Sequence, residues 1–114
     1  DLAHEYGRKV CVLGRSMVKN VEIAEELGLL KILGDTLIDL SEARAYDDDE
    51  ICFLVTGSQG EMRAALWNMA TSTYKGMQIE KGDTVVLSAR IIPGNERNIS
   101  RLIGHLYKRG ADII

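Results

Sequence analysis

The chain has 114 residues, with 14 lysines and arginines against 17 aspartates and glutamates, so its formal net charge at pH 7 is -3. This length suits one domain with a sizeable core, and the acidic balance excludes the uniformly basic surface of a stand-alone nucleic-acid-binding protein. No apolar run approaches the roughly 20 residues of a membrane-spanning helix, and the charged start does not resemble a signal peptide. We therefore expect a soluble, cytoplasmic protein.

The first predicted strand is the apolar run at residues 9–13. It follows what resembles the last turn of a helix capped by Gly7, so we expect a fragment that starts inside a domain. A glycine-containing turn at residues 14–16 leads into a helix that ends at Gly28, with Ser16 at its N-cap. The helical spacing of apolar residues predicts a buried face made of Met17, Val21, Ala24 and Leu27.

Short elements fill the next segment. We expect a strand at residues 37–39 and a brief helix at residues 42–45, capped by Ser41. Four adjacent carboxylates follow at residues 47–50, which could suggest a metal site. Adjacent residues point in different directions and no histidine is near, so we interpret this cluster as an exposed loop.

The central stretch of the chain is a strand followed by a glycine-rich turn and a helix. Residues 51–55 are an uninterrupted apolar run, which predicts a strand buried on both faces. A helix is expected from Met62 to Ala70, and Ser58 with Glu61 has the spacing of a capping box. Such a turn can present free N–H groups to an anion, although glycine and serine are also common there for geometry alone. The helix is expected to bury Met62, Ala65, Leu66 and Met69.

The last third repeats this order. After a short extended piece at residues 77–79, we expect a strand at residues 84–88 and then a helix that ends near Gly110. Pro93 suits the lead-in to that helix. A further strand is expected to open at residues 112–114. The buried face of the helix is predicted to be Ile99, Leu102, Ile103 and Leu106.

This alternation predicts an α/β fold with a mostly parallel sheet and flanking helices in three layers. Right-handed crossovers would place the turns at residues 14–16, 56–60 and 88–94 on one edge of the sheet, where ligands of such folds bind. Each turn carries a serine and either glycine or arginine. We therefore expect their hydrogen-bond donors to converge on a polyanion.

Catalytic and metal-binding groups are missing from this pattern. His4 and His105 are expected to be surface residues, far from any cluster of zinc ligands. Ser58 and Ser88 have no evident base partner, which argues against a serine nucleophile. We therefore predict no catalytic and no metal-ligating residue in this chain.

Three motifs resemble a known family. Residues 12–17 (Val-Leu-Gly-Arg-Ser-Met), 56–61 (Thr-Gly-Ser-Gln-Gly-Glu) and 88–96, which end in Ile-Pro-Gly-Asn-Glu, closely resemble the β-CASP region of bacterial ribonuclease J, in the metallo-β-lactamase superfamily. The likeness extends over nearly the whole chain from Gly7. Many relatives have proline where this chain has Met62, and Ser-Ala-Ser-Pro where it has Ser-Ala-Arg-Ile after residue 87.

The resemblance implies that residues 1–114 are a single β-CASP domain fragment, Rossmann-like in fold, of a zinc-dependent ribonuclease. Such a parent would degrade RNA from a 5′-monophosphate end and also cut internally, using two zinc ions whose ligands lie outside this chain. The expected partners are RNA, the protein's own metallo-β-lactamase domain and further copies in a homo-oligomer. The isolated fragment is expected to be inactive.

The resemblance also implies that the fragment caps the active site and binds RNA phosphates. Arg15 would act as a charged fork, and groups around Ser58 and Ser88 as neutral donors. Two alternatives are a nucleotide- or phosphate-binding Rossmann-like module without nuclease activity, and a structural or oligomerisation domain. The complete predicted site comprises Arg15, Ser16, Gly57, Ser58, Gln59, Gly60, Ser88 and Arg90.

Overall fold

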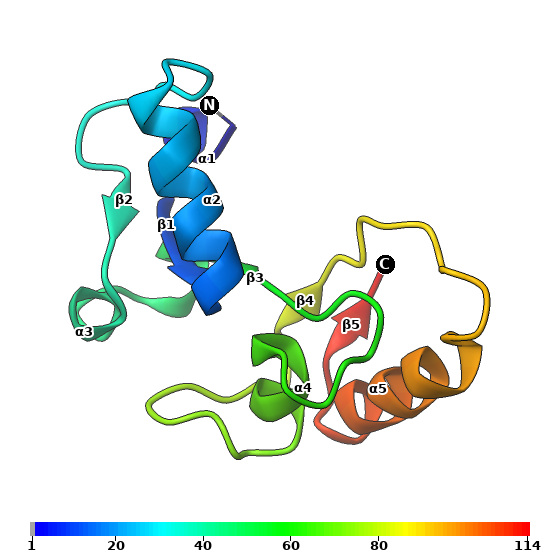
Figure 1. Cartoon of the computed structure of the whole chain (residues 1–114). Coiled ribbons are helices and arrows are strands. Elements are labelled where there is room, and N and C mark those ends of the chain that lie inside the picture. Colours follow the sequence, from blue (N-terminus) through cyan, green and yellow to red (C-terminus); the bar gives the residue numbers. More distant parts are fainter. Residues whose placement is uncertain (1) are drawn as a thin grey trace. The chain divides into compact units, whose positions relative to one another are not determined.

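The computed structural model describes residues 2–114 of a chain that divides into two compact units (Figure 1). The N-terminal unit ends at Thr56, and the C-terminal unit begins at Gly57. Each unit contains parallel strands with helices between them, which confirms the predicted α/β class. The strands form one sheet of three strands and one sheet of two strands. None of the helices in this described range has the length and apolar character needed to cross a membrane.

The N-terminal unit is built on a parallel sheet with the strand order β2-β1-β3. Its strands are β1 (Lys9–Leu13), β2 (Leu37–Ile38) and β3 (Ile51–Val55). β1 and β3 have the predicted bounds and pair along their whole length, from Lys9 opposite Ile51 to Leu13 opposite Val55. Their carboxyl ends therefore lie at the same edge of the sheet.

The helices of this unit are α1 (Leu2–Glu5), α2 (Arg15–Glu26), α3 (Leu40–Ala43) and the 3₁₀ turn η1 (Asp48–Glu50). Two of them begin at an N-cap residue that differs from the predicted one. The N-cap of α2 is Gly14, not Ser16, and that of α3 is Asp39, not Ser41. Asp39 takes this position because it forms a capping box with Glu42.

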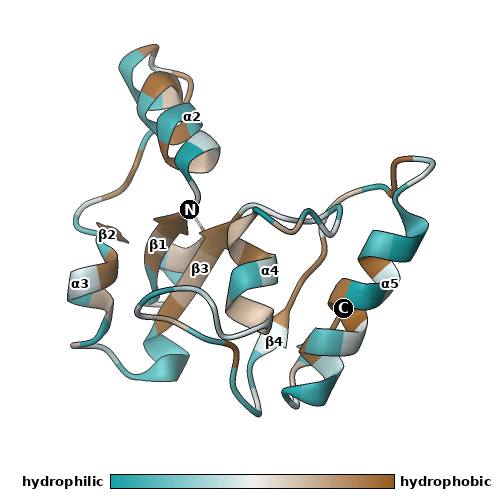
Figure 2. Ribbon diagram, turned by 60° about the horizontal axis from the view of Figure 1, so that its bottom comes forward, coloured by the Kyte–Doolittle hydropathy of each residue, from teal (hydrophilic) through white to brown (hydrophobic). Residues whose placement is uncertain are grey.

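Burial in the N-terminal unit is less complete than its apolar patterns predicted. Cys11 and Leu13 of β1 are buried, but on β3 Cys52 is exposed and Leu54 is 45% exposed. Exposed and half-buried residues alternate along β3, so one face of this strand is open to solvent and the prediction of burial on both faces was wrong. Leu27 is also exposed, while the rest of the predicted α2 face is half-buried. Figure 2 shows β1 and β3 as hydrophobic ribbons.

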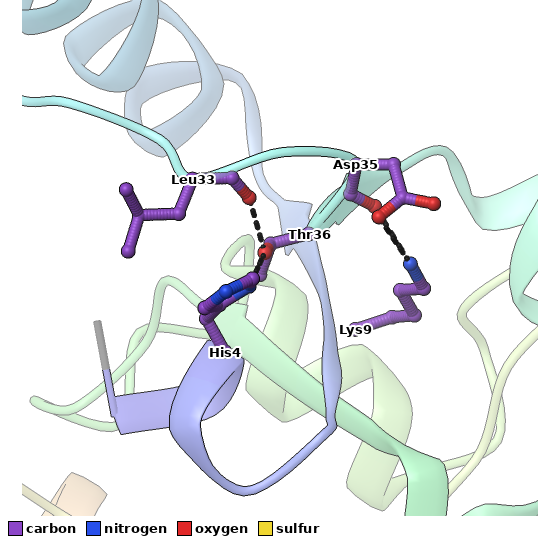
Figure 3. Close-up of polar contacts among 5 residues, drawn as sticks. All are labelled: His4, Lys9, Leu33, Asp35 and Thr36. Carbon is purple, nitrogen blue, oxygen red and sulfur yellow. Dashed lines mark hydrogen bonds and ion pairs between the residues drawn. The ribbon is translucent and has the colours of Figure 1, made fainter.

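Polar contacts fix the chain that leads into β2 (Figure 3). Thr36 donates to the Leu33 carbonyl at 2.6 Å, so its hydroxyl oxygen accepts from Nδ1 of His4 at 3.2 Å. Lys9 Nζ contacts Oδ1 of Asp35 at 2.9 Å and the Asp35 carbonyl at 3.0 Å. The hydrogen bond to Lys9 lowers the pKa of Asp35, and the same bond raises the pKa of Lys9.

The C-terminal unit contains a second strand-helix-strand repeat. Its elements are α4 (Ala65–Ala70), β4 (Thr84–Val85), α5 (Glu96–Lys108) and β5 (Asp112–Ile113). β4 pairs in parallel with β5, and the Leu87 N–H extends the pairing to the Ile114 carbonyl. β4 is thus shorter than the predicted strand at residues 84–88. Residues 77–79 form no strand, although Ile79 is buried.

Helices α4 and α5 pack together and supply most of the core of this unit. The predicted stripe of α5 is buried except for Ile103, which is 37% exposed. The buried apolar residues of the unit are Ala65, Leu66, Met69, Ala70, Ile79, Val85, Ile99, Leu102, Leu106 and Ala111.

Helix α4 begins at Ala65, three residues later than predicted. Its N-cap is Ala64, and Met62 is exposed instead of buried. The expected capping box is absent because the Glu61 carboxylate accepts the N–H of Gln59 at 3.2 Å, inside the preceding loop. Residues 57–64 therefore form a loop with its own packing, and not the first turn of a helix.

Candidate nucleic-acid interface

Two loops of the C-terminal unit carry six of the eight predicted site residues. The glycine loop (residues 57–64) leads into α4, and the proline loop (residues 88–95) leads into α5 (Figure 1). Gly57, Ser58, Gln59 and Gly60 lie in the first, and Ser88 and Arg90 in the second. Both loops follow strands, as the predicted site requires.

The side chain of Gln59 joins these two loops. Its Nε2 donates to the Arg90 carbonyl at 2.8 Å, and its Oε1 accepts the Ile92 N–H at 2.9 Å and Nδ2 of Asn95 at 3.3 Å. The side chain is 9% exposed, so these bonds are largely shielded from water. Gln59 therefore positions the proline loop against the glycine loop, and both polar atoms of its amide already have protein partners.

The two glycines of the first loop allow close packing. Gly60 has φ +75°, and a Cβ atom there would lie 2.5 Å from the backbone carbon and oxygen of Asn98 in α5. A Cβ on Gly57 would lie 3.0 Å from the Cβ atoms of Ala64 and Leu66. The Gly60 N–H donates to the Gly57 carbonyl at 3.1 Å. The glycines thus serve the fold of the loop and its contact with α5.

Donors remain on both loops once these internal bonds are made. Ser58 is half-buried, whereas Ser88 and Arg90 are exposed. Within residues 2–114, these three side chains make no hydrogen bond to protein. Hydroxyl and guanidinium groups on joined loops can donate to an anionic ligand, and a guanidinium can grip a phosphate with two N–H groups.

The remaining two predicted residues lie in the N-terminal unit. Arg15 and Ser16 are exposed in the first turn of α2. The preceding Gly14, with φ +105°, lies so close to Thr56 that a Cβ would be 2.6 Å from the Thr56 Oγ1. The turn after β1 therefore contacts the end of β3, which agrees with the expected common edge for these two strands.

Zinc does not fit the groups that the described residues gather. His4 is exposed, as predicted, and His105 is half-buried with its ring edge-on to Trp67 at 5.1 Å. Over residues 2–114 the carboxylates of residues 47, 49 and 50 form the sole trio of potential ligands within 4.8 Å, and all are exposed. A zinc site normally includes nitrogen or sulfur ligands, which this trio lacks.

Charge divides unevenly between the units, which the overall value of -3 conceals. The C-terminal unit has eight lysines and arginines against five acidic residues, a net charge of +3. The N-terminal unit has six against twelve, a net charge of -6. The basic unit is the one whose two loops Gln59 joins. Counting the charges of each half of the sequence separately would have revealed that the C-terminal unit is basic.

Comparison with known proteins identifies the family. Residues 1–106 match the family described as "Ribonuclease J, beta-CASP domain". A protein named Ribonuclease J from Helicobacter pylori (strain ATCC 700392 / 26695) is 42% identical over 109 residues, or 96% of this chain and 16% of the relative.

Two further relatives carry the same name. The protein from Thermus thermophilus is 45% identical over 112 residues, or 98% of this chain and 19% of the relative. That from Mycobacterium tuberculosis (strain ATCC 25618 / H37Rv) is 38% identical over 114 residues, all of this chain and 20% of the relative. The chain spans one fifth or less of these relatives. It belongs to the ribonuclease J β-CASP domain family.

Proposed function

We propose that this β-CASP domain binds the phosphate backbone of RNA and caps the active site of a ribonuclease J-like nuclease. The observation that carries the proposal is the Gln59 joint, which holds Ser58 on one loop and Ser88 and Arg90 on the other. Family membership supports RNA as the ligand class. The positive charge of the C-terminal unit supports an anionic ligand independently of that name.

The geometry suits binding without base recognition. Contacts to phosphate position a nucleic acid but carry no sequence information. Loops that are already held by buried hydrogen bonds lose little conformational freedom on binding, which favours affinity. We therefore expect this domain to bind RNA strands of different sequence with similar strength.

Hydrolysis is assigned to another part of the parent protein. The chain offers no set of described residues that fits zinc, so the two zinc ions of the proposal would be held by a metallo-β-lactamase domain. The parent would act in the cytoplasm as a homo-oligomer, both from 5′-monophosphate ends and internally. The isolated chain would bind RNA without cleaving it.

The test is RNA binding by the full-length protein with EDTA present to prevent cleavage. Fluorescence anisotropy with a 5′-monophosphorylated single-stranded RNA would compare Arg15→Ala and Ser58→Ala with two exposed controls, Arg44→Ala and Ser41→Ala. Loss of a cation at a phosphate should lower affinity roughly tenfold and reduce the salt slope by about 0.7. Ser58→Ala should lower affinity roughly threefold without changing the slope, because the hydroxyl is neutral.

Two results would contradict the proposal. Equal affinities for the site variants and their controls would remove these residues from the interface. Tighter binding of free nucleotides than of the RNA would instead favour a nucleotide-binding module.

A further inference from the structure

Helix α5 presents a row of basic side chains on one face. The basic row consists of Arg97, Arg101, His105 and Lys108, at spacings of four, four and three residues. At 100° per residue these positions fall within an arc of about 80°. All are exposed except the half-buried His105. Figure 2 shows hydrophilic residues along this helix.

The row is separate from the packed face of the same helix. Ile99, Leu102 and Leu106 are 5% exposed or less and point to the opposite side, where the unit's core lies. The arginines and the lysine are thus not required for packing. Their positions repeat about every 6 Å along the helix axis where the spacing is four residues.

The charges of the row are not neutralised within the described part of the chain. The single acidic residue of α5 is Glu96, and its carboxylate accepts the Gly94 N–H at 2.9 Å. The ion pair found in residues 2–114 joins Lys9 to Asp35 in the N-terminal unit. Like charges four residues apart on a helix repel, so an anionic ligand would relieve this repulsion.

A cavity lies at the far end of the row. It has a volume of about 290 Å³ and is lined by Ala70, Thr71, His105, Lys108 and Arg109. Arg109 Nε donates to the Ala70 carbonyl at 2.9 Å, which holds the guanidinium at the rim. This volume is close to the lower limit of ordinary ligand pockets, about 300 Å³, and is large enough for one nucleotide or phosphate group.

We propose that the basic row binds a single strand of RNA beyond the loops, with one nucleotide of that strand in the cavity. The inference rests on the proposed function, because it assumes that RNA reaches this unit. The row starts at Arg97, two residues after the proline loop, and extends about 16 Å along α5. A row of basic side chains without an apolar member matches a repeating anion better than an acidic protein surface, which would need apolar or aromatic anchors.

The experiment compares RNA length in the full-length protein with EDTA present. The double variant Arg97→Ala/Arg101→Ala is matched by Lys19→Ala/Lys31→Ala, which removes the same charge from exposed positions in the N-terminal unit. The probes are 5′-monophosphorylated oligouridylates of about 4 and about 14 nucleotides. The row variant should lose roughly tenfold in affinity for the long probe, with a salt slope smaller by about 1.4, and less than about twofold for the short one.

Separate outcomes test the row and the loops. If the row variant binds the long probe like its charge-matched control while Ser58→Ala binds both probes more weakly, the row is refuted and the proposed function stands. If the row variant binds RNA like Lys19→Ala/Lys31→Ala and Ser58→Ala binds it like Ser41→Ala, both proposals fail. The variant Arg97→Lys/Arg101→Lys keeps both positive charges, so the salt dependence of its RNA binding should be unchanged. This control distinguishes the loss of charge from a disturbance of the helix. Equal competition by polyglutamate would overturn the inference in favour of an acidic protein partner.

Discussion

The two units differ in core and in charge. The C-terminal unit buries ten apolar side chains among the described residues and carries a net charge of +3. The N-terminal unit buries four among its described residues and has a net charge of -6, although both units leave some large apolar side chains exposed. A basic surface can therefore lie on the better packed unit of an acidic chain, where its loops are held in place.

Core packing should give the largest difference between the units. Leu102→Ala removes a fully buried side chain of the C-terminal unit and should cost about 3–4 kcal/mol of unfolding free energy, measured by urea denaturation. The matched change Leu27→Ala removes a side chain that is 68% exposed in the N-terminal unit and should cost less than about 0.5 kcal/mol. Equal costs would contradict the contrast in core packing.

The glycine loop offers the next contrast, between two glycines with nearly the same φ. Gly28→Ala, at φ +72° in open space, should cost about 1 kcal/mol from backbone strain alone. Gly60→Ala, at φ +75°, adds a clash with the Asn98 backbone and should cost about 3 kcal/mol. Thermal unfolding would measure both. Similar values would show that the loop is not packed tightly on α5.

Loss of the Gln59 joint should have a smaller effect on stability and a clear effect on binding. Gln59→Ala removes three hydrogen bonds and should cost about 1–2 kcal/mol, because the exposed proline loop can replace part of them with water. Hydrogen exchange of the Ile92 amide should accelerate, and RNA affinity should fall. The exposed Gln78→Ala serves as the control. Unchanged exchange at Ile92 would rule out the positioning role.

The ion pair of the N-terminal unit should give the smallest effect, because Asp35 is 93% exposed. The pKa of Asp35 is lowered in the folded state, so its contribution to stability is present above the ordinary value of 3.8 and is lost as the pH falls. The pKa of Lys9 is raised, so its contribution is lost only as the pH rises above 10.5. Asp35→Asn should therefore be slightly less stable than the unmodified chain at neutral pH, and the difference should disappear as the pH falls below the lowered pKa of Asp35. Lower stability of the variant in acid would contradict this assignment.

Local patterns predicted the strands and the main helices well. The bounds of β1 and β3 and the buried stripe of α5 were apparent because continuous apolar runs and helical spacing are local signals. Local sequence patterns do not show whether another element covers an apolar face, so the burial of Leu27 and Leu54 was overestimated. The serine-glutamate spacing also mimicked a helix start, although Glu61 bonds inside a loop.

The candidate site was predictable as a set of segments but not as a set of contacts. Turns that follow strands are expected at one edge, which is why Ser58, Ser88 and Arg90 were singled out. The role of Gln59 was missed because its partners lie 31 to 36 residues away, and no local pattern encodes such pairing. Whole-chain charge hid the basic row because acidic residues of the N-terminal unit outweigh it.

Hydrogen–deuterium exchange of the full-length protein, with and without 5′-monophosphorylated RNA and with EDTA present, would report directly whether the two joined loops bind RNA. Binding of RNA by the joined loops predicts slower exchange at residues 57–64 and 88–95, with no change at residues 29–36 and 44–50 of the N-terminal unit. Unchanged exchange in both loops at saturating RNA would show that the loops do not bind RNA.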